Sequence, residues 1–357
     1  MTRGKLHEID LAHRRLAIAE INREYSQRFM SERHVKVGIM KEMGVKIMAF
    51  KCSDGRAHAN SYAGLPEGLI FPFRNIGGRF DLENWYHLNT AFITEIKRWL
   101  EYVNQFLILT SYHFSEGHPD LCCAGFGNNT QKAIEASSAL RDQILRLFPK
   151  RQTCLYHIHP ILCGFETDLE RIIFHNEHGD KFDPINFLDA DDKEVTAEID
   201  RKFKKEETVI KDAIVRLIMG NIPRVKKIKT RNKHLVDLGH RECILGVGKG
   251  FWFMNRPNKA IIVGPYDPNL EEQIEVAAHV VDENLAKGLV KHGFVLMTST
   301  LADKDDIYPA RARALSLQKT AVKVIEANYP HLMDKMLTMA VVVNRETMKF
   351  SEVHSKE

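Results

Sequence analysis

The chain has 357 residues, of which 44% are hydrophobic and 27% are charged, and its formal net charge is +4. A chain of this length is expected to form two domains, because single cores seldom grow past about 250–300 residues. The nearly balanced charge lacks the broad basic surface that nucleic-acid binding requires, and no apolar run approaches the roughly 20 residues of a membrane-spanning helix. We therefore expect neither nucleic acid nor a membrane as a partner.

Cysteine usage and the first residues bear on the compartment. Residues 1–24 carry charges throughout, unlike a signal peptide. Six cysteines in such a chain favour reduced thiols, some of them metal ligands, over a disulfide framework. We expect a cytoplasmic protein.

The first part of the chain is expected to form an amphipathic helix and then a β-α-β unit. Apolar residues at helical spacing place the helix before Arg33. Short apolar runs at residues 45–50 and 106–110 indicate buried parallel strands, and residues 88–106 between them have helical spacing. Each strand leads directly to a residue that can bind a metal. Side chains at the carboxyl ends of such strands lie where open α/β sheets bind ligands.

The first of these strand ends carries a Cys-x-Asp-x-Arg pattern formed by Cys52, Asp54 and Arg56. Side chains of an extended chain alternate with a period of two, so these three are expected to point to one side. Cysteine thiolate is a preferred zinc ligand, and the acid and base are suited to form an ion pair beside it. A metal ligand and an ion pair are therefore expected in one cleft.

The second strand end supplies an imidazole, His113, and a further thiol follows at Cys122 or Cys123. Only one of two adjacent cysteines can point at a metal if the segment is extended. His118 with Cys122 is the competing pair, although Pro119 disfavours the helix that would bring them together. Two thiols and one imidazole leave a fourth zinc position open for catalysis.

Residues 131–147 are expected to form a helix capped within Asn128-Asn129-Thr130, and the polar stretch 182–205 is the best candidate for a domain boundary. The part of the chain after this boundary is also expected to be α/β. Beyond it, residues 206–219 and 309–328 have helical patterns, whereas residues 260–264, 294–297 and 339–343 are short strands.

Several of these motifs together resemble the β-class carbonic anhydrases, and most closely the carboxysome shell carbonic anhydrases. The resemblance covers residues from about 40 to the end of the chain. It is carried by the Cys-x-Asp-x-Arg pattern and by these segments: Arg74-Asn75-Ile76-Gly77, Tyr112-His113-Phe114, Cys123-Ala124-Gly125-Phe126-Gly127, Gly164-Phe165-Glu166-Thr167-Asp168, Gly246-Val247-Gly248-Lys249-Gly250-Phe251 and Tyr329-Pro330-His331-Leu332.

The resemblance implies a mostly parallel sheet flanked by helices, followed by a second, degenerate α/β domain. The implied domains are an N-terminal helical segment (1–35), a zinc-binding catalytic domain (36–200) and a metal-free C-terminal α/β domain (201–357). The resemblance also implies a homodimer or larger homo-oligomer. Carboxysome components are possible partners, and the sequence leaves residence in a carboxysome open.

The implied activity is the reversible hydration of carbon dioxide to bicarbonate and a proton by a zinc-bound hydroxide. The matching ligands are Cys52, His113 and Cys123, with Asp54 and Arg56 as the catalytic pair. Asn75 and Gly77 either present polar groups to bicarbonate or form a simple turn. The alternative function is a noncatalytic, zinc-stabilised module that recognises an anionic metabolite or a protein partner.

A second His-x-x-Cys spacing, His240 to Cys243, mimics the ligand pair of ordinary β-class enzymes. No second cysteine precedes it in the C-terminal half. We interpret it as a worn copy of the catalytic repeat or as a coincidence, and we expect no second metal there.

Overall fold

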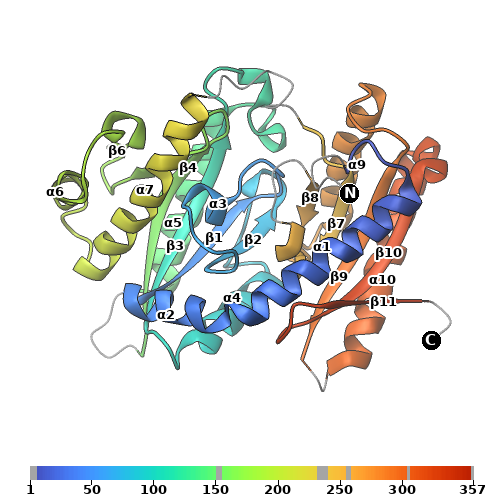
Figure 1. Cartoon of the computed structure of the whole chain (residues 1–357), viewed down its shortest axis with the longest axis horizontal. Coiled ribbons are helices and arrows are strands. Elements are labelled where there is room, and N and C mark those ends of the chain that lie inside the picture. The colour runs from blue at the N-terminus through green and yellow to red at the C-terminus, as the bar shows by residue number, and fades with distance from the viewer. Residues whose placement is uncertain (1–5, 150–154, 231–239, 255–258, 304–305, 355–357) are drawn as a thin grey trace. The chain divides into compact units, whose positions relative to one another are not determined.

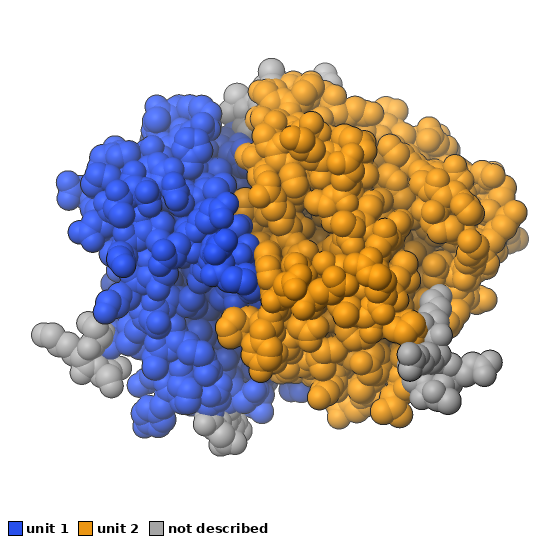
Figure 2. Space-filling model, turned by 180° about the vertical axis from the view of Figure 1, so that it is seen from behind, with its two compact units in different colours: residues 1–33, 53–56, 240–357 blue, residues 34–52, 57–239 orange. Residues whose placement is uncertain are grey.

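The structure is a computed structural model, which describes residues 6–149, 155–230, 240–254, 259–303 and 306–354. It is an α/β protein, and its contacts divide the chain into two compact units (Figure 1). Unit 1 comprises Met1–Arg33, Ser53–Arg56 and His240–Glu357, and unit 2 comprises His34–Cys52 and Ala57–Gly239 (Figure 2). The chain therefore passes between the units several times.

Unit 2 is built on a sheet with the strand order β2-β1-β3-β4-β5-β6, six strands among the described residues. Strands β2, β1, β3 and β4 are parallel, whereas β5 and β6 are antiparallel to their neighbours. The bounds of the strands are β1 Val45–Cys52, β2 Ile70–Asn75, β3 Gln105–Phe114, β4 His157–Glu166, β5 Arg171–His175 and β6 Lys181–Phe182.

Helices cover both faces of this sheet, so β1 is buried at every residue and shows no alternation of polar and apolar side chains. On one face Ile47 and Leu107 share a core with residues of α6 and α7. On the other face Phe50 contacts Phe92 of α4. The bounds of the helices are α2 Arg33–Met43, α3 Ala59–Tyr62, α4 Tyr86–Trp99, α5 Thr130–Leu147, α6 Asp192–Lys202 and α7 Thr208–Lys229.

Unit 1 contains a sheet with the order β11-β10-β9-β7-β8, five strands in the described ranges. Strand β11 is antiparallel to β10, and the other pairs are parallel. The elements are α1 Leu11–Ser31, β7 Ile244–Gly248, β8 Ala260–Val263, α9 Leu270–Ala286, β9 Phe294–Ala302, α10 Ile307–Asn328, β10 Met336–Asn344 and β11 Phe350–Val353. Every helix in the described ranges is too short or too polar to span a bilayer.

The predicted α/β class with two mostly parallel sheets is confirmed. The helix predicted at residues 131–147 is α5, and Asn129 caps it by accepting a hydrogen bond from the Lys132 amide. The segment 88–106 is helical only as far as Trp99, because β3 begins at Gln105. The strand predicted at 339–343 is part of β10, and a further strand, β11, follows it.

The compact units differ from the domain boundaries expected at residues 35/36 and 200/201. The polar stretch 182–205 contains α6, which begins with a capping box between Asp191 and Glu194. Helix α7 belongs to unit 2, because Ile214 and Leu217 are buried in the same core as strand β1. A polar sequence therefore marks the exposed face of a helix here and not a linker.

Candidate metal centre

Three segments of unit 2 bring two thiols and one imidazole together. Cys52 is the last residue of β1, and His113 is the penultimate residue of the adjacent parallel strand β3. Cys123 comes from the loop after β3, where it precedes a short 3₁₀ helix, η3 (Ala124–Phe126). Parallel strands end at the same edge of a sheet, so the first two side chains share that edge.

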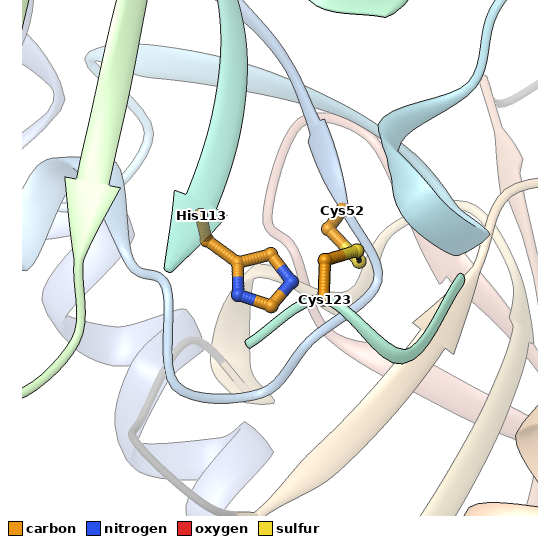
Figure 3. Close-up of side chains that lie close together, drawn as sticks. All are labelled: Cys52, His113 and Cys123. Carbon is orange, nitrogen blue, oxygen red and sulfur yellow. Dashed lines mark hydrogen bonds between the residues drawn. The ribbon is translucent and has the colours of Figure 1, made fainter. Parts of the chain in front are cut away.

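The ligand atoms of these three residues all lie within 4.8 Å of one another (Figure 3). The two sulfur atoms are 3.9 Å apart, far beyond the roughly 2.05 Å of a disulfide bond, so both are thiols. The residues are buried, with exposed fractions of 8% for Cys52, 2% for His113 and 1% for Cys123. Two sulfur donors and one nitrogen donor are a donor set that suits zinc.

A close approach of two backbones positions the loop that carries Cys123. A β-carbon added to Gly125 would lie 2.7 Å from both Cα and N of Gly77, so only glycine allows this contact. Gly77 itself has φ 69°, a left-handed conformation that favours glycine. Arg79 reinforces the contact, because its guanidinium donates to the Gly125 carbonyl and lies 4.6 Å from the centre of the Phe126 ring.

Cys122 lies outside the cluster among the described residues. Its sulfur accepts a hydrogen bond from the Ser115 amide at 3.4 Å and contacts the Thr130 hydroxyl at 3.5 Å. It therefore stabilises the loop between β3 and α5, while its neighbour Cys123 faces Cys52. Of the two cysteine alternatives, the structure brings Cys123 to His113 and leaves Cys122 apart.

The Asp54–Arg56 pair lies in unit 1 and is almost fully buried. The Arg56 guanidinium donates from Nη2 to Asp54 Oδ2 at 2.7 Å and from Nε to Oδ1 at 3.1 Å. The Arg56 amide also donates to Oδ1 at 2.7 Å. The expected ion pair is thus a two-pronged contact that fixes the orientation of the carboxylate.

Asn75 is the last residue of β2, and Gly77 lies in the turn that follows it. Asn75 is the register partner of Cys52, and its side-chain amide donates to the Arg79 carbonyl at 2.9 Å. Both residues thus have an evident part in the turn. Their contact with bicarbonate stays a prediction.

Tyr112, the residue before His113 in β3, makes a side-chain contact that was not anticipated from the sequence. The Tyr112 hydroxyl and His175 Nε2 are 2.8 Å apart. Burial lowers the pKa of His175 to about 4, so the ring is neutral at pH 7. Gly164 faces the tyrosine ring, since an added β-carbon would lie 2.7 Å from it. This contact packs the end of β3 against β4 and β5.

A second group of metal-binding types in the described residues consists of Asp54, His240 and Glu242, all of unit 1. Cys243 does not belong to it. Burial raises the pKa of Cys243 to about 11, so its thiol is protonated at neutral pH. The His240-to-Cys243 spacing therefore does not form a metal-binding pair in the structure. Sequence reasoning missed Glu242. The one feature that could have indicated it is its position two residues after His240.

Comparison with known proteins identifies relatives of the chain. Residues 38–222 match the family described as carboxysome shell carbonic anhydrase, catalytic domain. A carboxysome shell carbonic anhydrase of Prochlorococcus marinus subsp. pastoris is 29% identical over 231 residues, which cover 56% of this chain and 44% of the relative. One of Hydrogenovibrio crunogenus is 24% identical over 319 residues, which cover 79% of this chain and 59% of the relative. The chain thus spans about half the length of the curated relatives it matches.

Proposed function

Because the chain belongs to the family of carboxysome shell carbonic anhydrase catalytic domains, we propose that it is a carbonic anhydrase that interconverts carbon dioxide and bicarbonate. The observation that carries the proposal is the convergence of Cys52, His113 and Cys123 from three separate segments. These residues would bind one zinc ion. Zinc, when bound by three protein ligands, would supply a Lewis acid that makes water nucleophilic near neutral pH.

Asp54 and Arg56 have separate tasks in this proposal. Asp54 follows Cys52 by two residues in the chain, so its carboxylate would accept a hydrogen bond from the reacting water and orient it. Arg56 restrains that carboxylate with two hydrogen bonds, which would keep it from binding the metal as a fourth ligand. A purely structural zinc site would need neither residue, which favours the enzyme over a noncatalytic binding module.

The remaining assignments are part of the same proposal and rest on the family resemblance. Asn75 and Gly77 are assigned to the binding of bicarbonate. The names of both relatives place them in the carboxysome shell, so we assign this chain to the cytoplasm or to a carboxysome within it, with shell components as partners. A homodimer or a larger homo-oligomer is the assembly we propose.

The proposal is tested by measuring zinc content and stopped-flow carbon dioxide hydration on the same samples. Asp54→Asn should keep its zinc and lose roughly 10- to 100-fold in kcat, because a neutral amide accepts a weaker hydrogen bond from the water and cannot balance the charge of Arg56. Cys123→Ser should lose both zinc and activity, because one of three protein ligands is gone. Glu352→Ala, which removes an ion pair with Arg15 elsewhere in unit 1, is the matched control and should keep both.

A wild-type protein that contains zinc but hydrates carbon dioxide no faster than buffer would overturn the proposal. That result would support the noncatalytic module.

A further inference from the structure

We propose that Glu242 is a positioning residue that anchors the loop carrying Asp54 and Arg56 through the Gly55 amide. The inference deepens the proposed carbonic anhydrase function and rests on it. All of the residues involved belong to unit 1.

The anchor acts on the residue between the two members of the ion pair. Glu242 Oε1 accepts a hydrogen bond from the Gly55 amide at 3.2 Å. The Asp54 carboxylate accepts a hydrogen bond from the Arg56 amide. The loop Asp54–Arg56 is thus held by one hydrogen bond to Glu242 and by one within the loop. Moving Gly55 would therefore rotate Asp54 and Arg56 together.

Gly55 is packed directly against its anchor. A β-carbon on Gly55 would lie 2.7 Å from Glu242 Oε1, 2.9 Å from Glu242 Cγ and 2.8 Å from the Ala260 carbonyl oxygen. These distances are too short for any side chain. The backbone of the loop thus fits against the glutamate and β8 without free space.

The glutamate is itself fixed. Its side chain is fully buried, and it lies two residues before β7. Asn284 of α9 donates from Nδ2 to the Glu242 carbonyl at 3.3 Å. Nearby, the Ile262 amide of β8 donates to the Ser53 carbonyl at 3.3 Å. The segment Ser53–Arg56 is therefore held at two points of unit 1, by Glu242 and by strand β8.

The charged groups around Glu242 explain how a buried carboxylate can be stable at this position. Asp54 and Glu242 are two buried acids, and the Arg56 guanidinium, which pairs with Asp54, also attracts Glu242. His240 Nδ1 lies 3.1 Å from Glu242 Oε1, and Nε2 lies 3.8 Å from Asp54 Oδ2, so an imidazolium would face both acids. Burial disfavours that charge, and so does the charge of Arg56, but the attraction of Glu242 and of Asp54 outweighs both and raises the pKa of His240.

The same interaction keeps Glu242 ionised. Burial alone would raise the pKa of this carboxyl, yet the nearby His240 lowers it. An ionised carboxylate only accepts hydrogen bonds, which matches the amide that faces it. A divalent cation among Asp54, His240 and Glu242 is a poorer reading, because the Arg56 guanidinium already occupies both Asp54 oxygens.

Two variants of similar side-chain length separate the effect of the hydrogen-bond acceptor from the effect of the volume that the side chain fills. Glu242→Met fills the same space without an acceptor, whereas Glu242→Gln keeps an oxygen for the Gly55 amide. We expect Glu242→Met to lower kcat for carbon dioxide hydration by about 10- to 100-fold, with KM within about threefold and an unchanged zinc content. Glu242→Gln should recover kcat to within about fivefold of the wild type.

The control is Asn22→Ala in the same unit. Asn22 is also buried and accepts a hydrogen bond from a backbone amide, that of Phe350, at 2.9 Å. This variant should lower the melting temperature and leave kcat unchanged. Should Glu242→Met fail to fold, Gly55→Ala provides the second probe, because its methyl group would meet both the Glu242 side chain and the Ala260 carbonyl, shift the loop and lower kcat in the same way.

The outcomes separate the inference from the function on which it rests. A zinc-loaded wild type without activity overturns the proposed function itself. An active wild type overturns only the positioning role if Glu242→Met, or Gly55→Ala in its place, keeps wild-type kcat. A Glu242→Gln protein with a kcat as low as that of Glu242→Met also overturns that role, because an oxygen that accepts from the Gly55 amide would then not matter.

Discussion

The two sheets repeat one topology but differ in the side chains at their carboxyl edges. In unit 2 the first strand, β1, lies between β2 and β3, followed by a parallel β4 and an antiparallel β5. In unit 1 the first strand, β7, lies between β8 and β9, followed by a parallel β10 and an antiparallel β11. The connecting helices correspond as well, α4 to α9 and α5 to α10.

The strand ends of the two sheets have different chemistry. Strand β1 ends in Cys52, whereas β7 ends in Gly248, where an added β-carbon would lie 1.9 Å from the Ser299 carbonyl oxygen. Strand β3 carries His113 near its end, whereas β9 ends in Leu301 and Ala302. The repeated fold therefore specifies where a site can form, and the residues at its edge decide whether one does.

The position of the His240-to-Cys243 spacing also differs between the repeats. These residues precede β7, whereas the ligands of unit 2 lie at the ends of β1 and β3 and in the loop after β3. Of the two interpretations of this spacing, its position argues against a worn copy of the catalytic repeat and favours a coincidence. Its two residues are a histidine that contacts Glu242 and a buried thiol.

The largest expected effect comes from exchanging one buried cysteine in each unit. Cys52→Ser should weaken zinc binding by at least about 100-fold, because it removes one of three ligands. Cys243→Ser should leave one zinc per chain, because its protonated thiol takes no part in the cluster. Zinc content after dialysis against a competing chelator measures both. Equal zinc loss in the two variants would contradict the asymmetry of the units.

A smaller effect is expected from Gly125→Ala. Its methyl group would meet the Gly77 backbone, so we expect a loss of about 3 kcal/mol in the free energy of unfolding and weaker zinc binding. Gly38→Ala, in helix α2, is the matched control, because an added β-carbon meets no atom within 4 Å. It should stabilise the protein by about 0.5 kcal/mol. Denaturant unfolding with and without added zinc measures both, and equal stability of the two variants would count against the glycine contact.

The smallest effect concerns Lys46, a buried charge that β1 contains and the apolar strand β7 lacks. Its Nζ donates to the Leu69 carbonyl at 2.8 Å and lies 4.3 Å from the centre of the Trp99 ring. Burial lowers its pKa from 10.5 to about 7, partly opposed by the attraction of Glu95.

Between pH 7 and 10.5 the unfolded state thus binds more protons at this site, so stability should rise with pH there. We expect a gain of about 2 kcal/mol in the free energy of unfolding from pH 7 to 9, and Lys46→Met should remove this slope. Urea titrations at several pH values measure it. An identical slope in wild type and variant would show that other groups cause the dependence.

Local sequence patterns predicted the elements of the sheet edge well. Asn129 marks the start of α5 because its side chain caps a free amide. Strand β1 is recognisable because burial on both faces requires a mostly apolar run, interrupted here by Lys46. The strand ends then placed Cys52 and His113 together, since neighbouring parallel strands end at one edge. The family resemblance added the choice of Cys123 over Cys122.

The remaining features depend on contacts between distant segments and have no local pattern. Gly77 and Gly125 appear in the sequence as ordinary turn glycines, and only their close approach shows that each needs the other. Glu242 is far along the chain from Gly55, so nothing in the sequence around either residue indicates their hydrogen bond. Helix α7 belongs to unit 2 because of its buried face. The polar stretch before it predicted a domain boundary instead.

The division of the chain between the units has a consequence for synthesis on the ribosome. Cys52, His113 and Cys123 all emerge before residue 124, and domains generally fold as they are made, from the N-terminus onward. The partners of the Ser53–Arg56 loop, Glu242 and Ile262, emerge much later. Unit 2, which holds these three residues, is complete at Gly239, whereas unit 1, which supports the loop, is complete only at the end of the chain. Under the proposed function, the metal ligands would therefore be assembled before the acid–base loop is supported.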